Sequence, residues 1–175
     1  MDVIEYLGKR LVHDHELKEL EALALPEAKI VRDAGLQFVG TGQTRGTELS
    51  VGLVRADGMA EERMTLLAQT FFAVMVSKRG NEGFLPPNSL MGTSFCSCGL
   101  LCFVFEDVPD HRSLMIVQNA RQGSEDSPDC RLSWALDVRQ AVVHTHVGQS
   151  LETPFGTDYL ERVLREYQAM RSTGC

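Results

Sequence analysis

The run from Thr93 to Glu106 constrains the fold of this chain more than any other segment, because apolar residues occupy both its odd and its even positions. A strand with one exposed face alternates apolar and polar residues, whereas a strand buried on both faces reads as a nearly continuous apolar run. The run therefore predicts a central strand. Such a strand needs neighbouring strands and helices packed on the sheet.

The segment before this strand predicts a buried helix from about Met59 to Lys78. Glu61 and Glu62 lie in its first turns, and Lys78 and Arg79 lie at its end, which is the charge order that the helix macrodipole favours. Apolar residues cover more than one of its faces, so we expect this helix to be buried on several sides.

Helices are also predicted at both ends of the chain. The segment from Asp2 to about Ala24 carries an apolar stripe at helical spacing, and Pro26 ends it. Thr157 suits a helix N-cap, and the residues after it are amphipathic, with acidic and basic residues paired at i,i+4 spacing.

Short apolar or alternating segments predict the other strands. Leu114–Asn119 is expected to form a hairpin with the central strand, because Val108-Pro109-Asp110 between them is good turn material. The element order lacks a regular β-α-β alternation. We therefore predict a single α+β domain over residues 1–175, with a mostly antiparallel sheet, a buried central helix, and N- and C-terminal helices packed on it. The remaining strand candidates are Lys29–Arg32, Leu36–Thr41, Thr47–Arg55 and one long strand, or two, within Arg131–Val147.

The formal net charge of -7 argues against a nucleic-acid partner, because binding to phosphates needs clustered Lys and Arg and the basic residues here are scattered. The longest nearly apolar stretch, Leu66–Val76, is much shorter than the roughly 20 residues that span a bilayer, so we expect no membrane contact. The first residues are acidic where an export signal would be basic, and the five cysteines are an odd number. These features predict a cytoplasmic protein.

A pair of histidines is the sharpest candidate for a metal site. His144 and His146 alternate on a predicted strand, so both imidazoles could reach one ion on the same face. Asp158 follows at the start of the last helix and supplies a third ligand type that zinc accepts. This arrangement resembles the JAMM metallopeptidase signature, which implies a zinc-dependent hydrolase. The alternative is that the histidines are two polar residues on the outer face of a strand.

Cysteines form the second candidate cluster. Cys96, Cys98 and Cys102 would share one face of the central strand at a period of two residues. Cys98 is the candidate nucleophile, provided that a base such as His144 lies nearby and lowers the pKa of its thiol. The alternative is core packing, since cysteine without a disulfide is among the most buried residue types.

A turn, a strand, an apolar helix, a Gly/Pro segment and a second strand follow one another in Phe38–Gly42, Glu48–Leu53, Met64–Val76, Gly83–Pro87 and Phe95–Phe105. This order, over about Leu36 to Asp107, is similar to the suppressor-of-fused-like domain. The resemblance implies an α+β protein-binding module. Bacterial members of that family often look like immunity proteins, which neutralise a toxin by occluding it.

No assembled catalytic constellation is visible in the sequence, so the leading hypothesis is a non-enzymatic binding or adaptor module that acts on a protein partner and needs no cofactor. The alternative is an enzyme, either a divergent zinc hydrolase that uses His144, His146 and Asp158 or a thiol enzyme that uses Cys98. A homo-oligomeric structural component is the third class. The sequence names neither a partner nor a substrate.

Overall fold

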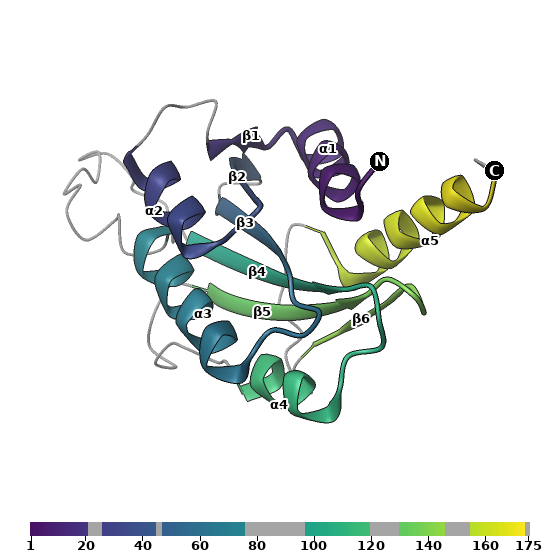
Figure 1. The fold of residues 1–175 in the computed structure, drawn as a ribbon. Coiled ribbons are helices and arrows are strands. Elements are labelled where there is room, and N and C mark those ends of the chain that lie inside the picture. Colours follow the sequence, from purple (N-terminus) through teal and green to yellow (C-terminus); the bar gives the residue numbers. More distant parts are fainter. Residues whose placement is uncertain (21–25, 45–46, 76–96, 120–129, 146–154, 174–175) are drawn as a thin grey trace.

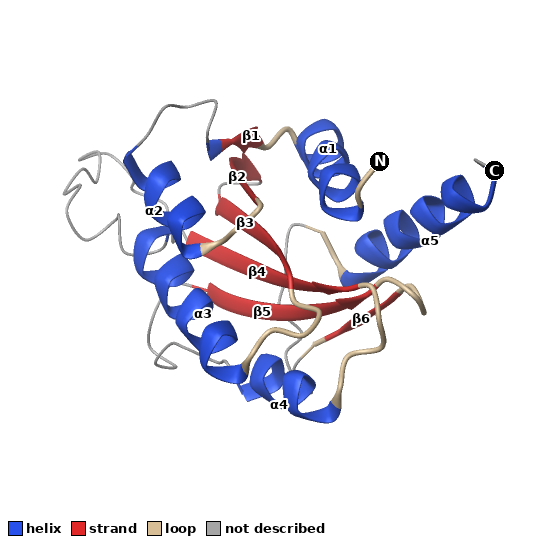
Figure 2. Ribbon diagram, in the orientation of Figure 1, coloured by secondary structure: helices blue, strands red, loops and turns tan. Residues whose placement is uncertain are grey.

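A computed structural model describes residues 1–20, 26–44, 47–75, 97–119, 130–145 and 155–173 (Figure 1). Helices and strands alternate along much of the described chain (Figure 2). None of the described helices is long and apolar enough to cross a membrane. The elements are α1 Val3–His15, β1 Lys18–Glu19, α2 Pro26–Ala34, β2 Phe38–Thr44, β3 Thr47–Arg55, α3 Glu61–Met75, β4 Ser97–Phe105, α4 His111–Asn119, β5 Cys130–Asp137, β6 Val142–His144 and α5 Thr157–Thr173.

The strands form one mixed sheet whose spatial order follows the chain, from β1 to β6. The pairs β1–β2, β2–β3 and β5–β6 are antiparallel. The pairs β3–β4 and β4–β5 are parallel, because α3 and α4 carry the chain back across the sheet between them. The predicted α+β class with a mostly antiparallel sheet is therefore confirmed, and its centre is a parallel β-α-β-α-β unit.

Helices cover both faces of this sheet, with α1 and α5 on one face and α2, α3 and α4 on the other (Figure 1). Strand β4 is buried at every position, as its apolar run predicts. Cys98, Leu100 and Cys102 belong to the core beneath α1 and α5. Leu101 and Phe103 belong to the core beneath α2, α3 and α4. Two apolar cores thus share one central strand.

The first helix is shorter than its sequence pattern predicts. It ends at His15, because Glu16 adopts the left-handed conformation with φ 53°. The polar stretch at residues 13–15, which interrupts the apolar stripe, marks the end of the helix. Leu17 and Leu20 are still buried, although they lie outside the helix.

Two predicted strands are helices. Lys29–Arg32 lies within α2, where Ala28 and Val31 face the core at i,i+3 spacing and Lys29 pairs with Asp33 at 2.7 Å. A window of four residues is too short to distinguish this spacing from that of a strand.

Leu114–Asn119 is likewise part of α4 and forms no hairpin with β4. Asp110 caps this helix, since its Oδ1 accepts a hydrogen bond from the amide of Ser113 at 2.7 Å. Val117 packs into the core beneath the helix. The Val108-Pro109-Asp110 segment is a helix start and not a hairpin turn.

The predicted central helix is confirmed as α3, and residues 76–78 of the prediction lie outside the described residues. Its core-facing side chains include Met64, Leu67, Phe71 and Phe72. Leu66, in contrast, is 52% exposed on the outer surface. Thr47–Arg55 and the C-terminal helix from Thr157 are also confirmed, and the predicted strand region from Arg131 forms β5 and β6.

Candidate functional site

An open hollow of about 680 Å³ lies at the carboxyl ends of the parallel strands β3 and β4. In open α/β sheets, ligands bind outside the carboxyl ends of the strands at a point where the strand order reverses. The order here, β1 to β6, has no such reversal, so the hollow is identified by the segments that meet there. Here the last residue of β3, the residue after β4, the start of α1 and the end of α5 converge. The hollow is lined by Met1, Asp2, Arg55, Glu106, Tyr167, Met170 and Arg171.

Arg55 holds the two carboxylates of the hollow together. Its Nη2 donates a hydrogen bond to Asp2 Oδ2 and forms an ion pair with Glu106 Oε1 at 2.9 Å. Arg171 approaches the other oxygen of Glu106 at 3.9 Å. All four side chains are more than one-third exposed, so each pair contributes only about 0–1 kcal/mol to folding. Their role is therefore to set the charge pattern of the hollow.

Tyr167 forms the apolar wall of the hollow. Its ring is buried against Tyr6, with 5.4 Å between the ring centroids, and its hydroxyl donates to the carbonyl oxygen of Met1 at 3.4 Å. The guanidinium of Arg171 lies 5.8 Å from the centroid of the same ring. Arg171 is thus held by a ring and a carboxylate while its side chain stays 60% exposed.

Asp57 fixes the loops that carry these side chains. Its two carboxylate oxygens accept hydrogen bonds from the amides of Glu106, at 3.1 Å, and Asp107, at 3.0 Å. These two hydrogen bonds therefore join the loop after β3 to the loop after β4. A further hydrogen bond joins the end of β3 to the residue before β2, because Gln37 Oε1 accepts from the amide of Arg55 at 2.7 Å.

The hollow is not apparent in the amino-acid sequence. Its residues come from segments far apart in the chain, and Asp57-Gly58 reads in the sequence only as a break before a helix. The available signal was a charged residue at the carboxyl end of each apolar strand, Arg55 as the last residue of β3 and Glu106 directly after β4. That signal has meaning only once β3 and β4 are known to be parallel.

The structure describes two of the three predicted zinc ligands, His144 and Asp158. His144 ends β6 opposite Ala135. Its neighbour Val143 belongs to the core beneath α1 and α5, so by alternation His144 projects from the other face of the sheet. Asp158 lies exposed in the first turn of α5.

His146 lies outside the described residues. Within the described ranges, no three His, Cys, Asp or Glu side chains gather in a way that could hold a metal ion. The zinc hypothesis therefore stays a prediction that rests on one described histidine.

The structure places Cys98 in the core, 5% exposed on the face of β4 that packs beneath α1 and α5. Cys102 lies further along the same face, and burial raises the pKa of its thiol. A nucleophile needs the opposite, an accessible thiol with a lowered pKa. The positions of Cys98 and Cys102 favour core packing, and Cys96 lies outside the described residues.

Strand β5 carries two buried polar side chains on the face beneath α4. Ser133 Oγ and Asp137 Oδ2 are both buried without a hydrogen-bond partner among the described residues. Asp137 Oδ1 accepts the amide of Gln140 at 2.8 Å and so caps the turn into β6. Four residues of strand separate the two side chains, roughly 13 Å, so they cannot share one small ligand.

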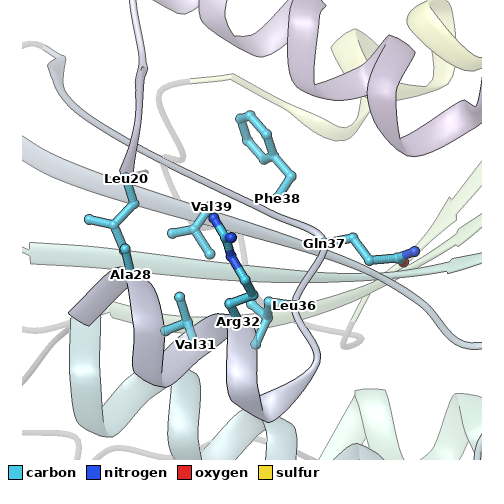
Figure 3. A pocket seen from close by; sticks show the side chains of 8 residues that line it. All are labelled: Leu20, Ala28, Val31, Arg32, Leu36, Gln37, Phe38 and Val39. Atoms are coloured by element: carbon cyan, nitrogen blue, oxygen red, sulfur yellow. The ribbon is translucent and has the colours of Figure 1, made fainter. Parts of the chain in front are cut away.

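A second, smaller crevice lies between α2 and β2 (Figure 3). Its volume is about 10 Å³, enough for at most one water molecule. Val31, Leu36 and Val39 make it apolar, while Phe38 points away from it toward the other side of the sheet (Figure 3). This crevice is a packing defect and offers no binding site.

Neither a family model nor a curated protein nor a solved structure matches this chain. The function must therefore be argued from the residues of the chain itself. The hollow brings together four charged side chains from four segments that are distant in the chain: Asp2, Arg55, Glu106 and Arg171.

Proposed function

We propose that this chain is a protein-binding module, which acts in the cytoplasm by covering part of a partner's surface, and that the hollow is its contact region. The observation that carries the proposal is the lining of the hollow. Arg55, Arg171 and Met170 are of the residue types that are enriched at protein interfaces, and arginine is also common among the energetic hot spots.

The same lining offers little for catalysis. These seven residues include no Cys, His or Ser, so the hollow itself holds no nucleophile with an adjacent base. Its two carboxylates, on Asp2 and Glu106, are bound to Arg55. An ion pair with arginine hinders a carboxylate that must take up and release protons during a reaction. In a recognition site, side chains that are already held in place lower the entropic cost of binding.

The net charge of the chain indicates the kind of partner that it would bind. The chain as a whole carries a net charge of -7, which speeds its encounter with a basic partner. Within the hollow, the guanidinium of Arg171 lies 3.9 Å from Glu106 Oε2, which is beyond hydrogen-bond distance, so its N–H groups can donate to a partner. We expect a partner with a basic surface that places an acceptor group, such as a carboxylate or a carbonyl, on Arg171.

Cross-linking and pull-down from the source cell, with the partner identified by mass spectrometry, tests this function. Binding to the captured partner is then measured for the wild type and for Arg171→Glu. Because interface hot spots contribute about 2 kcal/mol or more, the variant should bind at least about tenfold more weakly. Arg112→Glu is the matched control, since Arg112 is exposed on α4 on the opposite face of the sheet.

The control should bind within about twofold of the wild type. Equal affinity of all three proteins would refute the hollow as the contact region. Failure to capture any specific partner under cross-linking would count against the binding function itself.

A further inference from the structure

His15 joins the end of α1 to the start of α5 through its ring. The imidazole lies 4.6 Å from the ring centroid of Phe155 and 4.4 Å from that of Tyr159, which it meets edge to face. Phe155 and Tyr159 also contact each other, with centroids 5.4 Å apart. Three rings from two distant segments therefore form one cluster, which we call the His15 cluster.

The carboxylate of the neighbouring residue, Asp14, forms no hydrogen bond with the imidazole of His15. Asp14 accepts hydrogen bonds from the hydroxyl of Tyr159 at 3.0 Å and from Arg10 Nε at 3.1 Å, and it contacts His13 Nδ1 at 2.8 Å. His15 Nε2 is buried and has no hydrogen-bond partner among the described residues. A neutral imidazole tolerates this position at a modest cost, whereas an imidazolium would leave a charged N–H unpaired.

The electrostatics of the described surroundings also favour the neutral ring. Burial lowers the pKa of His15, and the positive charge of Arg162 lowers it further, while Asp14 opposes both effects. Burial and the hydrogen bond to Asp14 raise the pKa of Tyr159, so this hydroxyl keeps its proton. Arg10 is shared between Asp14 and Glu166 on α5, at 3.0 and 3.3 Å.

We propose that His15 is a proton-operated latch between the C-terminal end of α1 and the N-terminal end of α5. With a neutral imidazole the latch is closed, and the three rings pack together. When the ring takes up a proton, it leaves Phe155 and Tyr159 for solvent, and the two helix ends separate. Asp14 and Tyr159 then lose the packing that aligns their hydrogen bond.

The direction of the pH dependence follows from the lowered pKa. The closed state has its full stability above the ordinary pKa of histidine, about 6.5, and loses stability as the pH falls below it. Between pH 7.5 and 5.5, the equilibrium constant for local opening can rise by up to about tenfold, because the open state binds the proton more readily.

Hydrogen exchange monitored by mass spectrometry tests the latch on the intact protein. Peptides from the end of α1 and from the start of α5 are compared at pH 7.5 and 5.5, with exchange times scaled for the intrinsic rates. In the wild type, opening of both helix ends should increase at pH 5.5 by several-fold. Peptides from α3 in the same digest serve as the internal reference.

Two histidine variants separate the latch from a general effect of acid. His15→Phe keeps an aromatic ring and cannot take up a proton, so its opening should be independent of pH. His111→Gln should respond to pH like the wild type, because His111 is exposed at the start of α4, on the opposite face of the sheet from α1 and α5.

If His15→Phe fails to fold, His15→Gln replaces it. In His15→Gln, the opening of the two helix ends should be greater than in the wild type at pH 7.5 and equal at both pH values. A pH response that persists in the His15 variant would overturn the proposal. So would a wild type that opens equally at pH 7.5 and 5.5.

Discussion

Replacing Asp57 by alanine is expected to destabilise the protein by about 2 kcal/mol. The carboxylate accepts one hydrogen bond from the amide of Glu106 and one from the amide of Asp107. Both amides lie in a loop that water can reach once the carboxylate is gone, so neither becomes a buried unpaired donor. Each lost bond therefore costs about 1 kcal/mol, near the net value of a hydrogen bond in folding.

Two further variants divide this effect into its parts. Asp57→Asn keeps one oxygen acceptor but turns an NH₂ group toward the second amide, so about half of the loss, roughly 1 kcal/mol, is expected. Asp33→Ala removes another exposed carboxylate, that of the i,i+4 pair with Lys29 on α2, and should cost no more than about 0.5 kcal/mol.

Urea unfolding followed by circular dichroism and by the fluorescence of Trp134 measures all three free energies. The expected order of destabilisation is Asp57→Ala, then Asp57→Asn, then Asp33→Ala. If Asp57→Ala unfolds within about 0.5 kcal/mol of the wild type, Asp57 does not hold the two loops together, and the account of how the hollow is built is wrong.

Two other positions test the packing on either side of the sheet. Gly52→Ala should destabilise the protein by about 2 kcal/mol in the same urea assay, because an added Cβ would lie 2.7 Å from Leu36 Cδ2 and 2.8 Å from Phe71 Cε2, and a loss below about 0.5 kcal/mol would contradict this contact. Cys102 should react with a thiol reagent only after global unfolding, since burial raises its pKa and hides the sulfur; labelling of Cys102 in the native protein, mapped by mass spectrometry, would show that its strand opens locally.

The sequence predicts some elements well because one physical pattern dominates them. In β3, Leu49, Val51 and Leu53 alternate with smaller or polar residues, and all three are fully buried beneath α1 and α5. The same holds for β4, whose apolar run reflects helices on both faces. In these segments, local pattern and tertiary environment agree.

Prediction fails where an element is short. Lys29–Arg32 and Leu114–Asn119 are windows of four to six residues, and apolar residues at that length fit a strand and a helix about equally. In both places tertiary packing stabilises the helix, because Val31 of α2 and Val117 of α4 are buried in the core on that face of the sheet.

The second error also concealed the site. With α4 read as a strand, β4 and β5 no longer look parallel, and only the single β3-α3-β4 unit points to the carboxyl ends of β3 and β4. Arg55 and Glu106 then look like unrelated surface charges, although Glu106 lies 2.9 Å from Arg55 in the structure. The hollow could have been predicted only after the strand directions were known.

The position of Met1 and Arg171 at the hollow has a practical consequence for anyone who handles this protein. Both residues line the hollow, so a bulky group fused next to either of them would sit close to it. Such a fusion could block a partner and imitate the loss of a binding residue. A label attached through Lys29 avoids this, since Lys29 is 81% exposed on α2, on the opposite face of the sheet. Surface immobilisation through that position leaves the hollow open.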